Sequence, residues 1–374
     1  MNFKENIKVV QVFEEYPAFY QPYIPPVINK LRNNFKLDLK IHAYKGVSDK
    51  DVSIIPSYYY RRVIERLYAL FNRSKPKLNY AEIKYLKDKI DIVHLQHSFL
   101  FPKVLGLLKI PKNKRPKILI TLRGGDTYVK PWIHEKWLEF YKNEGNKVDA
   151  FIVMSEHQKM YLQKWGISKE NIHVIPISFG DSFGIKPKFP NPNKIKIISA
   201  FRMCWEKNIE GNLLTIKLLK EKGFPIQYDI YGDGPDLGQL FYLIDKYKIS
   251  DVVNVKGKVD NKILKNELIN YDFFLQLSYS ESFGVSVVEA QSYGVPAIVS
   301  NSDGLPEAIM DKESGYCVNP WDSKGAADLI LSLWNDANLY YEFSKKAIDN
   351  SHKKFTIKVE AQKLFELYSN LING

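Results

Sequence analysis

The chain has 374 residues, of which 45% are hydrophobic and 14% aromatic, so it can build packed cores and is long enough for two domains. Its two cysteines, Cys204 and Cys317, exclude a disulfide framework and favour a reducing cytoplasm. No apolar run approaches the ~18 residues of a transmembrane helix, and the first residues read as a strand rather than a signal peptide. A soluble or peripheral protein is therefore expected.

Charge is distributed unevenly along the chain. Residues 1–184 hold 31 Lys and Arg against 18 Asp and Glu, a net +13, whereas residues 185–374 hold 23 against 24, a net −1. A basic half favours an anionic partner such as nucleic acid, an anionic membrane face or a phosphorylated acceptor. The alternative is a surface whose charge only keeps the protein in solution.

Strand and helix patterns alternate along the first half and predict an α/β domain. Expected strands cover residues 7–13, 37–43, 91–97, 117–122, 149–154 and 172–176, with helices at 24–31 and 155–165. The loop after the first strand, residues 14–20, contains proline and aromatic residues but no glycine.

Two of these strands end in polar residues, which would lie at the carboxyl edge of a parallel sheet, where ligands bind. His94 and His97 belong to the strand at 91–97, and Arg123 and Asp126 follow the strand at 117–122. A histidine there can bond a substrate hydroxyl or phosphate, or it can be a satisfied core side chain. Arg123 is permanently charged and cannot act as a base.

The most basic stretch is 58–89, with nine Lys and Arg against three acidic residues. Within it Ile64, Leu67, Tyr68 and Phe71 are predicted to share one helical face. The remaining positions carry arginines: Arg61, Arg62, Arg66 and Arg73. This pattern is typical of a helix at a membrane interface, or of an amphipathic helix packed on the sheet.

The second half opens after a linker rich in glycine and proline, residues 177–193. Expected strands at 194–200, 226–231 and 252–256 are each followed by candidate ligand-binding residues. These residues are Arg202 and Lys207 after the first strand, Gly232 and Gly234 after the second, and Lys258 after the third. An amphipathic helix, residues 356–371, ends the chain.

Residues 273–299 read as strand, loop, helix and strand, one βαβ unit. Glu281 lies in the loop and Glu289 about two turns into the helix. The helix N-terminus beside Phe283 and Gly284 suits a phosphate, and the carboxylates can accept hydrogen bonds from sugar or ribose hydroxyls. The alternative is that both are solvated surface charges.

The pattern S-x-x-E-x-F-G-x-x-x-x-E-A-x-x-x-G-x-P is met by eight residues: Ser278, Glu281, Phe283, Gly284, Glu289, Ala290, Gly294 and Pro296. It resembles the signature of the retaining glycosyltransferases of family 4, also called group 1. A Gly-Gly usually follows, but here the first glycine is Asp303. The resemblance implies a GT-B fold of two Rossmann-like doubly wound domains facing a cleft. The first domain would cover residues 1–184 together with a C-terminal helix, residues 356–374, that crosses back to it. The second domain would cover residues 185–355.

The resemblance also implies roles for the second domain. Glu281 would contact the donor sugar and Glu289 the ribose, while Arg202 and Lys207 hold the diphosphate. Two cations suit a leaving group that gains negative charge. Four further residues would provide backbone groups near the nucleotide: Phe283, Gly284, Gly232 and Gly234. Lys258 would add one more cation there.

In the first domain the resemblance implies an acceptor side with His94, His97 and Asp126. Gln96 stands where the family often has a second histidine. Arg123 replaces the histidine of the family's H-G-x-D and is expected among the catalytic residues, on a phosphate or sugar hydroxyl.

The expected reaction moves a hexose-type sugar, with retention, from a nucleotide-diphosphate sugar to a glycan or polyprenyl-diphosphate-linked acceptor in surface polysaccharide biosynthesis. Capsule, exopolysaccharide and O-antigen are examples of such surface polysaccharides. No cofactor beyond the donor, no metal and no nucleic-acid partner are expected. The inner face of the plasma membrane would be the place of any peripheral attachment. The alternatives are a GT-B nucleotide-sugar epimerase and a basic nucleic-acid-binding protein.

Overall fold

The computed structural model describes residues 6–17, 21–72, 76–180, 182 and 184–374. The chain forms two compact units, Met1–Pro176 with Glu360–Gly374, and Ile177–Val359. Residues 177–184, which the sequence analysis places in the first domain, belong to the second unit. Of the C-terminal helix α14 (Ile357–Asn373), residues from Glu360 onwards belong to the first unit.

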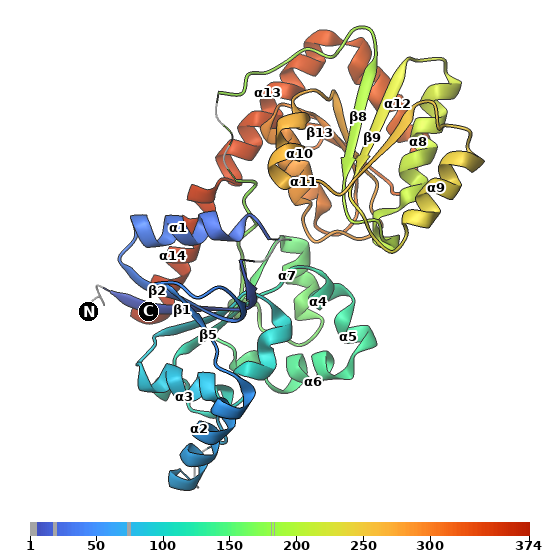
Figure 1. The fold of residues 1–374 in the computed structure, drawn as a ribbon. Helices are drawn as coiled ribbons and strands as arrows, with labels where there is room; N and C mark the ends of the chain where they lie inside the picture. The colour runs from blue at the N-terminus through green and yellow to red at the C-terminus, as the bar shows by residue number, and fades with distance from the viewer. Residues whose placement is uncertain (1–5, 18–20, 73–75, 181, 183) are drawn as a thin grey trace. The chain divides into compact units, whose positions relative to one another are not determined.

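The first unit contains a parallel sheet of seven strands in the order β3-β2-β1-β4-β5-β6-β7 (Figure 1). Their bounds are β1 Ile7–Tyr16, β2 Leu37–Gly46, β3 Val52–Ile54, β4 Ile92–Leu95, β5 Lys117–Thr121, β6 Ala150–Val153 and β7 Ile172–Val174. Strand β3 was not predicted, because three residues are too few to show a period of two. Strand order reverses between β1 and β4, so their carboxyl ends diverge into a crevice where ligands bind in open sheets.

Helices connect these strands. Their bounds are α1 Ile24–Asn34, α2 Tyr58–Phe71, α3 Tyr80–Lys87, α4 Gly125–Tyr128, α5 Lys130–Ile133, α6 Glu135–Asn143 and α7 Glu156–Gln163. Ser155 begins α7 as predicted, and its hydroxyl accepts the Gln158 N–H at 3.1 Å. Asn79 and Glu82 begin α3 with a reciprocal capping box.

Helix α2 contains the first part of the basic stretch, and none of its residues is buried. The predicted apolar face is divided, because Ile64 and Tyr68 are partly covered whereas Leu67 and Phe71 are exposed. Arg73 lies outside the described residues, as do residues 18–20 of the glycine-free loop.

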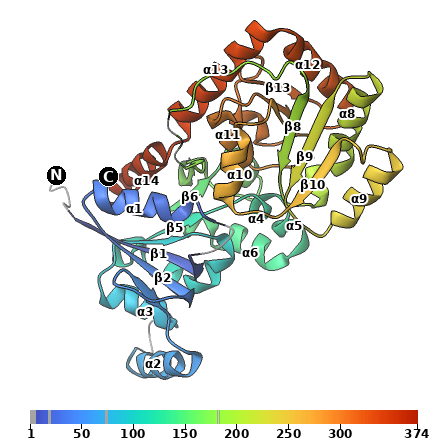
Figure 2. The same ribbon diagram turned by 45° about the horizontal axis from the view of Figure 1, so that its top comes forward.

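The second unit is a parallel sheet of six strands in the order β10-β9-β8-β11-β12-β13 (Figure 2). Its strands are β8 Ile195–Ala200, β9 Ile226–Tyr231, β10 Val253–Gly257, β11 Phe273–Gln276, β12 Ala297–Ser300 and β13 Gly315–Val318. Its helices are α8 Ile209–Glu221, α9 Leu237–Lys246, α10 Asn261–Leu268, α11 Val285–Ser292, α12 Ser323–Asn335 and α13 Ala337–Lys354. The order reverses between β8 and β11. The predicted pair of doubly wound α/β sheets is thus confirmed.

Among the described residues, no helix is both long and apolar enough to cross a membrane.

Candidate functional site

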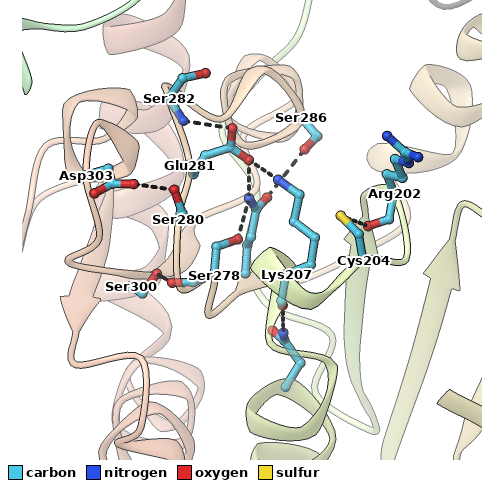
Figure 3. A network of polar contacts seen from close by, with 12 residues as sticks. Arg202, Cys204, Lys207, Ser278, Ser280, Glu281, Ser282, Ser286, Ser300 and Asp303 are labelled. Atoms are coloured by element: carbon cyan, nitrogen blue, oxygen red, sulfur yellow. Dashed lines mark hydrogen bonds and ion pairs between the residues drawn. The ribbon is translucent and has the colours of Figure 1, made fainter. Parts of the chain in front are cut away.

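The predicted donor residues of the second unit meet where its strand order reverses. Arg202 and Lys207 follow β8, and Glu281 follows β11, the strand that pairs with β8. Because both strands point the same way, their carboxyl ends bring these loops together. Lys207 Nζ forms an ion pair with the Glu281 carboxylate, and the two side chains are only 15% and 17% exposed (Figure 3). The loops are also joined by a backbone hydrogen bond of 2.7 Å from Tyr279 N–H to Glu206 C=O.

Gln276, the last residue of β11, orients Glu281. Its amide Nε2 donates to Glu281 Oε2 at 3.0 Å and to Ser278 Oγ at 3.1 Å. The Ser282 N–H donates to the other carboxylate oxygen at 3.1 Å. Gln276 is fully buried, so its amide can hold the carboxylate in one orientation. Gln276 falls in the strand predicted at the start of residues 273–299, and no sequence signal indicated its role.

Two glycines shape the loop that carries Arg202. A Cβ on Gly232 would lie 1.9 Å from the Phe201 carbonyl oxygen, and one on Gly234 would lie 2.2 Å from that of Met203. The backbones approach this closely because Met203 N–H donates to Asp233 C=O at 3.0 Å. The predicted Gly232 and Gly234 therefore support the Arg202 loop, and the Arg202 side chain itself is exposed.

Asn208 directly follows Lys207 in the chain. Its φ of 48° is left-handed, a conformation that asparagine adopts more readily than other side chains. Its side chain accepts the Gly211 N–H at 3.0 Å and so begins α8, and it donates to Pro320 C=O at 2.7 Å. These contacts of Asn208 hold the backbone next to Lys207.

Glu289 has partners different from those of Glu281. It lies in α11, is 7% exposed, and accepts a 3.0 Å hydrogen bond from Asn261 Nδ2 of α10. Lys265 Nζ of the same helix lies 3.5 Å from the carboxylate. Burial raises the pKa of Glu289, against the opposing effects of Lys265 and Asn261. Neither α10 residue was expected from the sequence.

Three other residues were predicted to lie near the nucleotide: Phe283, Gly284 and Lys258. Phe283 is buried, with its ring edge-on to Phe355 at 5.1 Å, so only its backbone is left to contact a ligand. Gly284 begins α11 with a φ of 91°, which favours glycine. Lys258 is exposed after β10.

In the first unit, His94 belongs to a buried polar network. Its Nδ1 is 2.7 Å from the Tyr368 hydroxyl of α14, and its Nε2 is 2.7 Å from Thr121 Oγ1 of β5. Burial, with the charge of Arg123, lowers the pKa of His94 to about 3. The structure thus places His94 as a satisfied core histidine, one of the two alternatives left open by the sequence.

The network continues to Arg123. Tyr368 OH accepts from Gln11 Nε2 at 3.2 Å, and Gln11 Oε1 accepts from Gln96 Nε2 at 3.0 Å. Gln96 Oε1 in turn accepts from Arg123 Nη2 at 2.9 Å, and the Arg123 guanidinium lies 5.4 Å from the centre of the Tyr23 ring. Arg123 and Gln96, which both replace family histidines, therefore contact each other. Side chains of this network line a cavity together with Glu360 of α14.

Asp126 and His97 are both held by neighbours. The Asp126 carboxylate accepts the N–H groups of Arg123 and Gly124, each at 3.0 Å, and so fixes the turn after β5. The His97 ring stacks on Phe99 and hydrogen bonds to Gln21. Burial and the Arg123 charge lower the pKa of His97 to about 3, which makes it a neutral group near pH 7.

The segment Asp49-Lys50-Asp51 has the Asp-x-Asp spacing of a metal-binding motif and was not among the predicted sites. Asp49 Oδ1 accepts the N–H groups of Asp51 and Val52, and Asp51 pairs with Arg32 at 3.8 Å. Within the described residues no three His, Cys, Asp or Glu side chains gather as a metal site would require.

Comparison with known proteins matches both units to families. Residues 183–350 match the model "Glycosyl transferases group 1", and residues 31–177 match "Glycosyltransferase Family 4". The chain is 24% identical to N-acetyl-alpha-D-glucosaminyl L-malate synthase of Bacillus anthracis over 81% of each chain. It is 24% identical to poly(ribitol-phosphate) alpha-N-acetylglucosaminyltransferase of Staphylococcus aureus, over 83% of this chain and 62% of the relative.

Several other curated relatives are longer proteins. The chain spans 31% to 53% of the length of four peptide N-acetylglucosaminyltransferase GtfA subunits. Among solved structures, Anabaena HepE in complex with UDP aligns over 97% of this chain and 100% of its own, with a TM-score of 0.73 and 14% identity. That likeness shows the fold. Together with the two family matches and the signature at Glu281 and Glu289, it establishes that the chain belongs to the group 1, or family 4, glycosyltransferases with a GT-B fold.

Proposed function

We propose that this glycosyltransferase moves a hexose-type sugar, with retention, from a nucleotide-diphosphate sugar to a glycan or lipid-linked acceptor of the cell surface. The observation that carries the proposal is the Lys207–Glu281 ion pair, held by Gln276 where the strand order reverses. Relatives whose names specify an N-acetylglucosaminyl group favour an N-acetylhexosamine. The UDP in the HepE structure favours a uridine nucleotide.

The donor would use the charges of the second unit in two ways. Arg202 and Lys207 would neutralise the diphosphate, whose charge grows as it leaves. Glu281 would accept hydrogen bonds from the sugar hydroxyls, and Glu289 from the ribose. Lys207 is already desolvated beside Glu281, so a bound diphosphate would share a cation that is held in place.

The transfer itself needs no protein nucleophile in this proposal. The acceptor hydroxyl oxygen bonds to the anomeric carbon as the bond from that carbon to the diphosphate oxygen breaks. The hydroxyl proton passes to the leaving diphosphate, on the same face of the sugar, which retains the configuration. Arg123 would bind a phosphate or hydroxyl of the substrate, since it cannot accept a proton.

The first experiment identifies the donor and then tests the residues. Thermal shift with UDP-N-acetylglucosamine, UDP-glucose, GDP-mannose and ADP-glucose selects the nucleotide, and we expect the UDP-sugars to stabilise the protein. Arg202→Ala, Lys207→Ala and Glu289→Ala should each lower transfer about tenfold to a hundredfold, because each removes a charged hydrogen bond worth ~1.5–3 kcal/mol. Lys217→Ala, in a surface pair with Glu221, is the matched control.

Unchanged transfer in all three variants would refute the site. A product with inverted anomeric configuration, read from its NMR coupling constant, would refute retention. Conversion of the donor to another nucleotide sugar without acceptor would instead support the epimerase alternative.

A further inference from the structure

Helix α2 presents an uncovered apolar surface on the first unit. Figures 1 and 2 both show it projecting past α3, away from the strands of its own sheet. Tyr59 is 83% exposed, Leu70 59% and Phe71 85%, and no residue of the helix is buried. Contiguous exposed apolar side chains of this kind mark interaction sites in folded proteins.

The inner side of α2 contacts other parts of the first unit, and these contacts fix the orientation of the helix. Glu65 Oε1 accepts the Tyr80 N–H at the start of α3 at 3.0 Å, and the Tyr60 ring lies edge-on to that of Tyr80 at 6.0 Å. The Arg61 guanidinium lies 5.8 Å from the centre of the Tyr44 ring. Ile64 and Tyr68 are partly covered on the same side.

The opposite side, which we name the outer face of α2, has helical spacing of its own. All its members are exposed, and they are Tyr59, Arg62, Val63, Arg66, Leu67 and Leu70. It joins four apolar or aromatic groups to two arginines. Glu65, the single acidic residue of the helix, points to α3, so the outer face carries only positive charge.

The combination of arginines with apolar and aromatic groups indicates which kind of partner the outer face of α2 binds. In a twofold pair of α2 helices the arginines of one copy would face those of the other, an arrangement that the repulsion of like charges disfavours. Nucleic acid would satisfy the arginines but would leave Val63, Leu67 and Leu70 against phosphate and water. An anionic bilayer surface offers phosphates for the arginines, an interfacial layer for Tyr59 and acyl chains for the aliphatic groups.

We infer that the outer face of α2 docks on an anionic lipid surface, with Val63, Leu67 and Leu70 entering the boundary of the acyl chains and Arg62 and Arg66 on lipid phosphates. The inference does not rest on the proposed reaction, because it concerns only this helix and its charge. The net +13 of residues 1–184 would add long-range attraction.

The test measures cosedimentation of the full chain with vesicles of equal parts phosphatidylglycerol and phosphatidylcholine, beside pure phosphatidylcholine vesicles. We expect binding to the anionic vesicles, weakened by salt. Arg62→Glu with Arg66→Glu should lower the partition coefficient by roughly 30-fold or more, since each cation contributes about 1 kcal/mol near such a surface. Lys345→Glu with Lys353→Glu, exposed on α13, makes the same charge change elsewhere and should lower it much less.

A second pair of variants separates apolar insertion from general attraction. Leu67→Ser with Leu70→Ser keeps every charge and should still lower binding at least several-fold. Phe241→Ser with Tyr242→Ser, both exposed on α9, should leave it unchanged. Circular dichroism checks that all variants fold, which we expect because the altered side chains are exposed.

The inference fails if the wild-type chain does not bind anionic vesicles at low salt, or if the α2 variants bind as wild type does. It also fails if sedimentation shows a dimer that the leucine pair dissolves, because a second copy would then occupy the outer face. Binding of RNA that the arginine pair abolishes, without vesicle binding, would equally overturn it.

Discussion

At the scale of single residues, Arg123 and Gln96 act as a pair. Each occupies a position where the family has histidine, and the 2.9 Å hydrogen bond between them joins the turn after β5 to the end of β4. Gln96 is itself held by Gln11, so the guanidinium is fixed from behind while Tyr23 lies against it. Replacing either member removes the hydrogen bond between them.

We therefore predict that Arg123 and Gln96 are energetically coupled. Gln96→Ala should lower kcat/KM for sugar transfer about tenfold in the wild type but change it little in the Arg123→Ala background, because a charged hydrogen bond contributes ~1.5–3 kcal/mol. Arg123→His should keep more activity than Arg123→Ala, since histidine still donates a hydrogen bond. The double-mutant cycle is measured by kinetics at saturating donor. Additive effects of the two changes would contradict the coupling. Equal activity of the Arg, His and Ala enzymes would show that Arg123 is structural.

At the scale of elements, the turn between β9 and α9 supports the loop that carries Arg202. Gly232 has a φ of 132°, and its Cα faces the Phe201 carbonyl so closely that a methyl group cannot fit. Gly223, after α8, also has a positive φ, 78°, but no atom lies within 4 Å of the position that a Cβ would take there. The two glycines therefore separate backbone strain from a steric clash.

Gly223→Ala should cost about 1–2 kcal/mol of unfolding free energy through left-handed strain alone. Gly232→Ala should cost more, ~3 kcal/mol or above, because the Phe201 backbone must also move. Denaturant titration measures both, and nucleotide binding by the folded Gly232 variant should weaken as the Arg202 loop shifts. An equal loss in the two variants would contradict the steric account.

At the scale of the whole molecule, neutral histidines make the first unit sensitive to acid. His42, 3% exposed, stacks on Tyr85 with ring centres 5.5 Å apart, and burial lowers its pKa from 6.5 to about 4. The unfolded chain therefore takes up a proton at higher pH than the native chain does. The stability that His42 contributes is complete above pH 6.5 and is lost as the pH falls towards 4.

His42→Phe should flatten this dependence, since a phenyl ring can stack on Tyr85 and cannot be protonated. Between pH 7 and 4 the wild type should lose roughly 3 kcal/mol more unfolding free energy than the variant, from the shift between the two pKa values. Urea titrations at several pH values provide the measurement. The same change at His134, which is exposed, serves as the control, and parallel curves for wild type and His42→Phe would contradict the prediction.

The sequence alone determined the order of the elements and the family. Hydrophobic periodicity located most strands, because each buried strand is a local run of apolar residues. The spacing from Ser278 to Pro296 was readable because a strand, a loop and the first turns of a helix are contiguous in the chain. The same locality placed Glu281 and Glu289 on the loop and helix where the structure has them.

Only the tertiary structure decided which side chains meet. Gln276 with Glu281, Asn261 and Lys265 with Glu289, and Tyr368 with His94 are pairs formed by sheet register and helix packing, and none has a signature in its own segment. Exposure was likewise undetermined: α2 has an amphipathic pattern that suits a packed helix, yet its outer face is uncovered. The physical reason is that periodicity records which residues share a face, whereas the distant parts of the chain decide what, if anything, covers that face.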